Sequence, residues 1–581
     1  MNVSYFGNKD KLPLSAIVFL SYISIAFIFL LAYFYSERAF TLNLLDNDDF
    51  MRLHQFSNWL ENGNWYLKPL EDFNQNDGQI IHWSRVPDIP LAAFTLLFCL
   101  VVSADVAISY AIIVVPLIYL IGTVFAIGLI TQKFLGKKYV VLACLYAFGS
   151  HLITKFYPGS IDHHNIQLLL LAWFVALCPL SEKDAEQSKY AVIQGVLLAV
   201  SFWIGIENLP VFAAILVTLC GFGYWHSKTF LKYIRDLCCC ATIASLICIL
   251  LNRPFNEFLV LHVDMISWGY AFCLFVGGLF CQLSLSFDTQ RHTLFKFLIL
   301  GLISVATIFL FVPELVKGVY FDYPKLLVDT WLSNVSEARP ILSYIKDDGF
   351  LSNFNYILFI FPALLSILLF NKEKGMVLLY LTMIFILLTA VLWQVRTIFS
   401  VFIFAVPLQA YLVIKFTEKY SSSLLRVSIS LICVPIGISL FVSHINTDTE
   451  NEAKALSNLE KVSYLVESDI REKKVLAPMG YGAPILAHTS NSVIAAPYHR
   501  NIAGNELMTR IFLSTDLDAA KQTILEHGFD YVVVGNDSSS NVLRNYSEEG
   551  AFIMELGRKN FDWLQEVTGN GNEVKVYQVV K

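Results

Sequence analysis

The stretch that decides the fold is residues 13–36, PLSAIVFLSYISIAFIFLLAYFYS, an apolar run without a single charged residue. A helix of this length spans the hydrocarbon core of a bilayer, which needs about 20 apolar residues. Similar runs recur as far as His444, and 56% of the 581 residues are hydrophobic whereas only 15% are charged. This composition excludes a soluble globular chain and predicts a polytopic α-helical membrane protein.

Fourteen segments qualify as candidate spans, and the first lacks a cleavage motif, so we expect it to stay as a helix. The candidates are 13–36, 89–105, 107–131, 139–157, 166–180, 190–206, 209–225, 233–251, 265–285, 293–312, 354–371, 375–394, 397–415 and 425–444. Short loops rich in Lys and Arg predict the cytoplasmic side. Those loops are 182–189, 226–235, 290–296, 371–374 and 415–426.

A consistent orientation is possible only if one candidate span does not cross, which leaves about 13 spans. Lys133, Lys137 and Lys138 favour the cytoplasm, so residues 89–105 are expected to lie along or dip into the outer face. The alternative, that residues 139–157 do not cross, stays open.

The polar tail differs in composition from the rest of the chain, so we expect two domains. Residues 1–445 form a membrane domain with outer loops at 37–88, 158–165 and 313–353, and residues 446–581 form a soluble external α/β domain. Alternating and apolar runs predict strands at 474–477, 492–496, 531–535 and 573–580, with an amphipathic helix over 505–527. We expect a multi-pass protein of the cell (inner) membrane with a periplasmic tail. The net charge of −6 argues against nucleic acid as a partner.

Three polar clusters stand beside apolar spans and fall on the same predicted side of the membrane. They are Asp46-Asn47-Asp48-Asp49, Ile161-Asp162-His163-His164 and Asn334-Val335-Ser336-Glu337. Crowded carboxylates are costly unless a cation or hydrogen-bond donors compensate. Each cluster alone is more typical of a solvated loop. Together they predict a site at the membrane boundary that binds a divalent metal or performs acid–base chemistry.

Two arginines are candidates for binding phosphate. Arg396 stands in strongly apolar sequence, where an unpaired charge is costly, so we expect it to pair with a lipid phosphate rather than only with a structural carboxylate. Arg85 ends the segment His82-Trp83-Ser84-Arg85, which is either an interfacial anchor or a phosphate- or sugar-binding segment.

The order of these motifs resembles the catalytic subunit of oligosaccharyltransferase, a GT-C class membrane glycosyltransferase, over nearly the whole chain. Asn334-Val335-Ser336-Glu337-Ala338-Arg339-Pro340 is similar to its Ser-Val-Ser-Glu-His-Gln-Pro loop. Val395-Arg396-Thr397 is similar to its Val-Arg-Leu segment, and Met479-Gly480-Tyr481-Gly482-Ala483-Pro484-Ile485 to its Trp-Trp-Asp-Tyr-Gly motif.

The resemblance implies transfer of a sugar or oligosaccharide from a polyprenyl-(di)phosphate donor to an acceptor at the external face. It implies Asp48, Asp49 and Glu337 as catalytic residues and a divalent metal, Mg²⁺ or Mn²⁺, held by Asp48, Asp162 and His164. The donor phosphate would be held by Arg396 and Arg85.

The chain departs from the family at the acceptor-binding motif. Pro478, Met479 and Gly480 stand where the family has Trp-Trp-Asp, so we expect a glycan or a different protein site as acceptor, not an Asn-x-Thr peptide. On the acceptor side we expect two exposed loops, one with Tyr481 and Gly482 and the other with His499; a tight turn and a surface histidine are the alternative. Two further functions stay open: a transporter or flippase for lipid-linked glycans, and a non-catalytic assembly protein.

Overall fold

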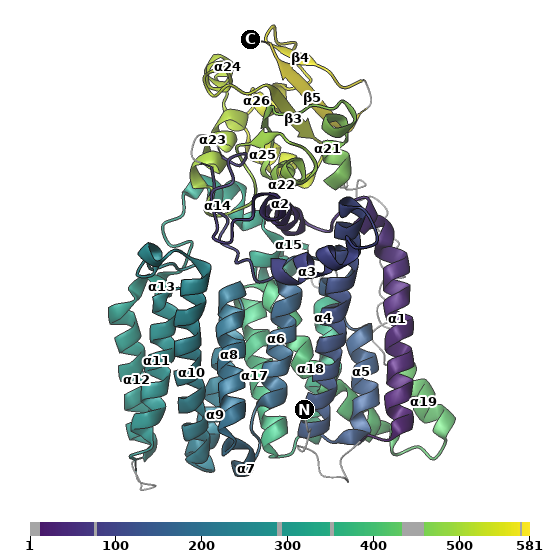
Figure 1. Ribbon diagram of the computed structural model, residues 1–581, viewed down its shortest axis with the longest axis vertical. Helices are drawn as coiled ribbons and strands as arrows, with labels where there is room; N and C mark the ends of the chain where they lie inside the picture. Colours follow the sequence, from purple (N-terminus) through teal and green to yellow (C-terminus); the bar gives the residue numbers. More distant parts are fainter. Residues whose placement is uncertain are drawn as a thin grey trace.

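The computed structural model describes residues 12–74, 78–287, 293–348, 354–432, 458–569 and 572–580. Most helices stand side by side in one layer, and the C-terminal part of the chain lies on one side of this layer, the domain side (Figure 1). The arrangement confirms the predicted class, a polytopic α-helical membrane protein with a C-terminal α/β domain.

Six of the described helices are long and apolar enough to cross a membrane. They are α1 (Leu14–Phe40), α4 (Ala104–Phe134), α10 (Thr229–Asn252), α12 (Thr293–Phe311), α17 (Lys374–Leu392) and α18 (Ile398–Thr417). Shorter helices complete the layer: α3 (Asp88–Phe98), α5 (Val140–Gly149), α6 (His164–Leu177), α8 (Ser188–Ile204), α9 (Leu209–Trp225), α11 (Trp268–Ser284), α16 (Phe354–Leu365) with η7 (Ser366–Leu369), and α19 (Ser423–Ile432). The predicted span 425–444 is described only to Ile432, and its remainder lies outside the described residues.

Helix α3 belongs to residues 89–105, the segment that the sequence predicts not to cross the membrane. Its 11 residues rise by roughly 16 Å, about half of a bilayer core. It packs against α4, which is 31 residues long and runs through the layer. Helix α5 has 10 residues; η2 (Lys137–Tyr139) precedes it, and η3 (His151–Phe156) follows it after Ser150, whose backbone is extended. That residues 89–105 do not cross the membrane stays a prediction.

The connections between the layer's helices carry the remaining short helices. Those are α2 (Asn47–Asn62), α7 (Glu182–Ala185), η4 (Phe255–Glu257), α13 (Pro313–Lys317), α14 (Lys325–Thr330), η5 (Leu332–Asn334), η6 (Ser336–Ala338), α15 (Ile341–Asp348) and η8 (Val395–Thr397). The Asp46 carboxylate accepts the backbone N–H groups of Asp48 and Asp49, both at 3.0 Å, and so caps the start of α2. Gly63, with a φ of +66°, ends α2 in a left-handed turn.

The C-terminal α/β domain is built on a five-stranded sheet of order β2-β1-β3-β5-β4. The strands are β1 (Lys474–Leu476), β2 (Ser492–Val493), β3 (Tyr531–Gly535), β4 (Leu564–Glu566) and β5 (Val574–Val579). β1 pairs in parallel with β2 and β3, whereas β5 is antiparallel to β3 and β4. The helices are α21 (Asn458–Glu467), α22 (Met479–His488), α23 (Ile502–Leu513), α24 (Leu517–Glu526), α25 (Ser538–Tyr546) and α26 (Phe552–Glu555).

The structure corrects three predicted elements of this domain. The helix expected over 505–527 is two helices, α23 and α24, because the Asp516 carboxylate accepts the N–H of Ala519 and starts a new helix. The strand β4 was not predicted. The segment from Gly480 to Gly482, expected as an exposed loop, lies inside the buried helix α22.

The α/β domain is joined to the helical layer through the first connection of the chain. Helix α2 packs directly on α22. The backbone of Asp72 accepts the N–H of Val493 at 2.9 Å, so the residues after α2 cover the edge of β2. The Tyr498 hydroxyl donates to the backbone carbonyl of Asn47 at 2.9 Å. Segments from both ends of the sequence therefore meet above the helical layer (Figure 1).

Candidate functional site

The three acidic residues at the start of α2 have different surroundings. Asp46 caps the helix, as described above. Asp49 is only 1% exposed, and one of its oxygens accepts the backbone N–H groups of Ile161 and Asp162 at 2.7 and 2.8 Å. Asp48 lines a large cavity. The first acidic cluster thus touches the second directly, but only Asp48 of the three faces the cavity.

Asp162 lies in a buried ion-pair network with two histidines. It contacts the ring of His163, and its other oxygen is 3.4 Å from Nε2 of His164. The opposite nitrogen of His163 is 3.1 Å from Glu207. Burial alone would raise the pKa of Asp162, but His163 and His164 hold it below its usual range. Burial would lower the pKa of His163, yet Asp162 and Glu207 raise it to about 10, so this ring is a cation at neutral pH.

Glu337 reaches the same network from η6. One of its oxygens is 2.8 Å from the ammonium of Lys155, and the other is 3.7 Å from Nε2 of His164. Burial would raise the pKa of this carboxyl, but His164 and Lys155 together lower it, so Glu337 is ionised at neutral pH.

Asp48 has the opposite electrostatic environment. Burial raises its pKa well above the usual range, and the neighbouring carboxylates of Asp162 and Asp46 raise it further. A carboxyl in such surroundings becomes an anion readily only when a cation joins it.

These residues surround a cavity of about 800 Å³ on the domain side of the helical layer. The lining includes Asp48, His164, Glu337, Arg396 and His499. Arg396 is in η8, directly before α18, where its Nε donates to the side chain of Gln394 at 2.9 Å. A volume of this size accommodates an organic ligand with several groups. Of the predicted site residues, the structure therefore brings Asp48, Asp162, His164, Glu337, Arg396 and His499 together.

Arg85 does not reach the cavity. Its guanidinium donates to the backbone carbonyl of Gln55 at 2.9 Å and to Asp88 at 3.2 Å, in the contact between α2 and α3. Asp88 also accepts from Arg52, which is fully buried. This pairing satisfies the charge of Arg85 locally, so the predicted phosphate contact is corrected to a structural ion pair.

Tyr481 and Gly482 also lie away from the cavity. The Tyr481 side chain is fully buried, and its hydroxyl donates to Asp537 at 2.5 Å inside the α/β domain. A Cβ added to Gly482 would lie 2.1 Å from the carbonyl oxygen of Ala495, so glycine is needed there for close packing. The acceptor-side prediction is thus corrected for these two residues, and their role is packing.

Sequence reasoning missed three charged residues of the network. Lys155 is in η3, Glu207 is between α8 and α9, and His163 was noted without a role. Glu207 could have been found, because it is a lone carboxylate at a span end on the side where the other clusters fall.

The described residues contain two groups of side chains that could hold a metal ion. One is Asp162, His163 and His164 within this network, and the other is His82, Asp264 and His499. In each group the potential ligand atoms lie within 4.8 Å of one another.

No protein-family model and no curated protein matches this chain. Solved structures do match. The archaeal oligosaccharyltransferase AglB from Archaeoglobus fulgidus, in complex with an inhibitory peptide and a dolichol-phosphate, aligns with 92% of this chain and 72% of its own, at 14% identity and a TM-score of 0.65. The Archaeoglobus fulgidus oligosaccharyltransferase tethered to an acceptor peptide with an NVT sequon aligns with 96% of this chain and 74% of its own, at 13% identity and a TM-score of 0.60. This chain therefore has the fold of the oligosaccharyltransferases, the membrane glycosyltransferase fold of the GT-C class.

Proposed function

We propose that this chain is an integral membrane glycosyltransferase. It transfers a sugar or oligosaccharide from a polyprenyl-(di)phosphate donor to an acceptor at the external face of the membrane. The observation that carries the proposal is one cavity whose wall combines Asp48, His164 and Glu337 with the guanidinium of Arg396. Transfer from a phosphate leaving group needs both kinds of group, a cation for the departing charge and a carboxylate for the acceptor.

The side chains around Asp162 fit a divalent metal. One oxygen of Asp49 is buried without a hydrogen bond from any described residue, and a buried oxygen of this kind is costly unless a cation satisfies it. The Asp162 oxygens face the rings of His163 and His164, and the potential ligand atoms of these three residues lie within 4.8 Å of one another. Asp48, Asp162 and His164 would hold the ion, and the oxygen-rich set favours Mg²⁺ or Mn²⁺. When bound, the ion would neutralise the charge that develops on the leaving phosphate.

Arg396 binds the donor phosphate in this proposal. Its guanidinium lies in the cavity wall at the end of a membrane helix, the level at which a lipid headgroup is found. Planar N–H groups suit phosphate oxygens. The dolichol-phosphate bound by the archaeal oligosaccharyltransferase of similar fold supports a polyprenyl carrier here.

Glu337 orients the acceptor. Lys155 and His164 keep this side chain ionised and fix its direction, while the side chain as a whole stays 39% exposed. An ionised carboxylate at the cavity wall accepts a hydrogen bond from the attacking group and draws its proton away as the new bond forms. Asp49 acts behind the site, where it holds the backbone before His163 in place.

The proposal extends to placement in the cell. Residues 1–445 form the membrane domain, and residues 446–581 form a periplasmic domain of an inner-membrane protein. The basic loops at the other ends of the helices support this orientation. A flippase is the weaker candidate because transporters place their polar site near the membrane midplane, on broken helices. Here the charged residues lie at helix ends on the domain side.

The decisive experiment compares cells that lack the protein with cells that carry Asp48→Asn. A transferase predicts that both accumulate the lipid-linked glycan and lose the glycosylated product, while the variant protein stays at native abundance. Glu71→Gln is the matched control, because this exposed acid lies in the same loop outside the cavity. If Asp48→Asn restores the product fully, the transferase proposal fails and a non-catalytic assembly role replaces it.

A further inference from the structure

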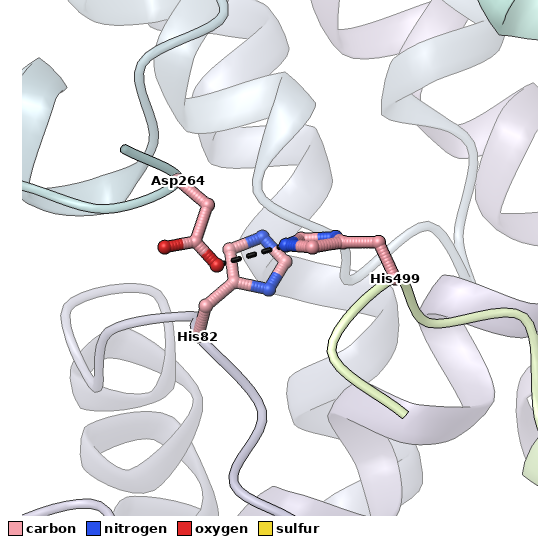
Figure 2. A group of neighbouring side chains, drawn as sticks. All are labelled: His82, Asp264 and His499. Atoms are coloured by element: carbon pink, nitrogen blue, oxygen red, sulfur yellow. Dashed lines mark hydrogen bonds and ion pairs between the residues drawn. The ribbon is translucent and has the colours of Figure 1, made fainter. Parts of the chain in front are cut away.

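A second cluster of ionisable residues lies in the cavity wall, apart from the network around Asp162. His82 comes from the connection after α2, Asp264 from the loop between α10 and α11, and His499 from the α/β domain. Figure 2 shows the three side chains converging on one point. Their potential ligand atoms all lie within 4.8 Å of one another. Nothing in the proposed transfer reaction uses this cluster.

The Asp264 carboxylate, at the centre of this cluster, is held by hydrogen bonds from neighbouring residues. Nε2 of His499 is 2.8 Å from one oxygen of Asp264. The guanidinium of Arg500 donates to both Asp264 oxygens, at 2.5 and 2.7 Å. Ligand carboxylates in metal sites are typically oriented by an outer hydrogen bond of this kind. Arg500 therefore acts as the partner that fixes the carboxylate, and His499 lies within hydrogen-bond distance of it.

His82 completes the group. The centroid of its ring lies 4.7 Å from that of the His499 ring, and its potential ligand atom lies within 4.8 Å of those of Asp264 and His499. Among the described residues we find no hydrogen-bond partner for its ring nitrogens, so the ring is available to a ligand.

We propose that His82, Asp264 and His499 form a second metal site, which binds Zn²⁺ or a similar transition metal. Two imidazoles and one carboxylate suit a borderline ion better than Mg²⁺, which prefers oxygen ligands. Since the Asp162 network is richer in carboxylates, the two sites select different ions.

Three protein ligands leave a coordination position that opens into the cavity, because all three residues line it. Zinc sites with an open position bind a water or an oxygen of a ligand. The site therefore offers a contact to an anionic oxygen of whatever occupies the cavity. Its ligands also come from three separate segments, so the ion would fasten the α/β domain to the helical layer.

The test uses full-length protein in detergent, stripped with a chelator and titrated with Zn²⁺ by calorimetry. The variants are His82→Gln and His499→Gln. The matched control is His262→Gln, whose imidazole lies 3.4 Å from Arg500 and outside the proposed ligand set. Asp162→Asn combined with His164→Gln removes the other site, so that only the second remains. Melting temperatures in chelator verify that each variant is folded.

We expect the Asp162→Asn, His164→Gln protein to retain one Zn²⁺ per chain. On that background His82→Gln or His499→Gln lowers the affinity at least about tenfold, whereas His262→Gln leaves it unchanged. Co²⁺ in place of Zn²⁺ gives visible absorption bands that the same two substitutions remove. If the double variant binds no Zn²⁺, or if His82→Gln and His499→Gln bind it like the control, the site is only a hydrogen-bonded contact between domains. That outcome leaves the transferase proposal intact.

Discussion

At the scale of single residues, neighbouring aspartates at the start of α2 take three roles. Asp46 caps the helix, Asp48 faces the cavity and Asp49 accepts two backbone N–H groups from the second cluster. The sequence predicts that this run matters, because crowded carboxylates at a span end are costly. It cannot assign the roles, because they depend on which residue is the N-cap and on a contact with residues more than a hundred positions away.

Asp48 and Asp49 should respond differently to the loss of charge. Asp49→Asn keeps an oxygen that accepts the N–H groups of Ile161 and Asp162, so we expect it to retain most transfer activity. Asp49→Ala leaves both donors unsatisfied, at a cost of about 1–3 kcal/mol each, and lowers the melting temperature. Asp48→Asn should keep the melting temperature and abolish transfer. Equal loss of activity in Asp48→Asn and Asp49→Asn would contradict these assignments.

Arg396 should determine how well the donor binds. Arg396→Leu removes the charged hydrogen bonds to phosphate, so the KM for the lipid-linked donor should rise about 10- to 100-fold. Arg396→Lys keeps the charge but not the planar pair of donors. Its KM for the donor should therefore lie between that of the unchanged protein and that of Arg396→Leu. Steady-state kinetics with purified protein measure this, with Arg426→Leu as a control on an exposed arginine. An unchanged KM in Arg396→Leu would exclude the phosphate contact.

Metal affinity at the first site should depend on pH. Burial and the charges of Asp162 and Asp46 raise the pKa of Asp48, so protons compete with the ion for this carboxyl. Affinity for Mn²⁺ should therefore fall as pH is lowered, by up to about tenfold per pH unit for each proton displaced. Calorimetric titrations between about pH 7.5 and about pH 5.5 measure the slope. The slope of the Mn²⁺ affinity against pH should be shallower in Asp48→Asn than in the unchanged protein. Equal slopes would show that another group titrates.

The same raised pKa has a consequence for stability. With no ion bound, the folded state holds the Asp48 proton more tightly than the unfolded state does. The contribution of this group to stability is therefore greatest at low pH and is lost as pH rises through the raised pKa. Binding of a cation reverses that trend, because the ion stabilises the charged form.

At the scale of elements, the length of apolar runs and the alternation of apolar residues predict those helices and strands that local sequence determines. Four strands of the α/β domain and the long spans follow from such patterns. The break between α23 and α24 depends on a single N-cap at Asp516, and β4 has only three residues, so neither stands out in a periodic pattern. The glycines of α22 predict a loop, because glycine allows tight backbone turns beside a strand; here they allow close packing inside the domain.

Helix α22 should therefore be sensitive to a single added methyl group. In Gly482→Ala the Cβ would meet the backbone of Ala495, so the helix must shift, and overpacking of this kind costs about 1–3 kcal/mol. We expect a lower melting temperature, measured on the full-length protein. Gly569→Ala is the matched control, since its Cβ would meet nothing within 4 Å. The prediction fails if both substitutions have the same effect.

At the scale of the whole molecule, the fold is that of the oligosaccharyltransferases, but residues 478–480 differ from the Trp-Trp-Asp motif of that family. Pro478, Met479 and Gly480 lack the side chains that would bind the hydroxyl residue of a sequon, and α22 is buried. We therefore expect no transfer to an Asn-x-Thr peptide when purified protein is supplied with its lipid-linked donor, as measured by mass spectrometry. Detection of a glycosylated sequon peptide would restore Asn-linked transfer as the function.

The hydrogen bond between Tyr498 and Asn47 joins residues that lie 451 positions apart. At a synthesis rate of about 5–20 residues per second, roughly 20–90 s pass between the translation of these two residues. During that interval the helix ends that carry Asp48 and Asp162 lack the wall supplied by His499. The wall of the cavity is therefore complete only after the α/β domain has been synthesised and has folded onto the helical layer. On the proposed function, a growing chain would lack a complete site for its substrates.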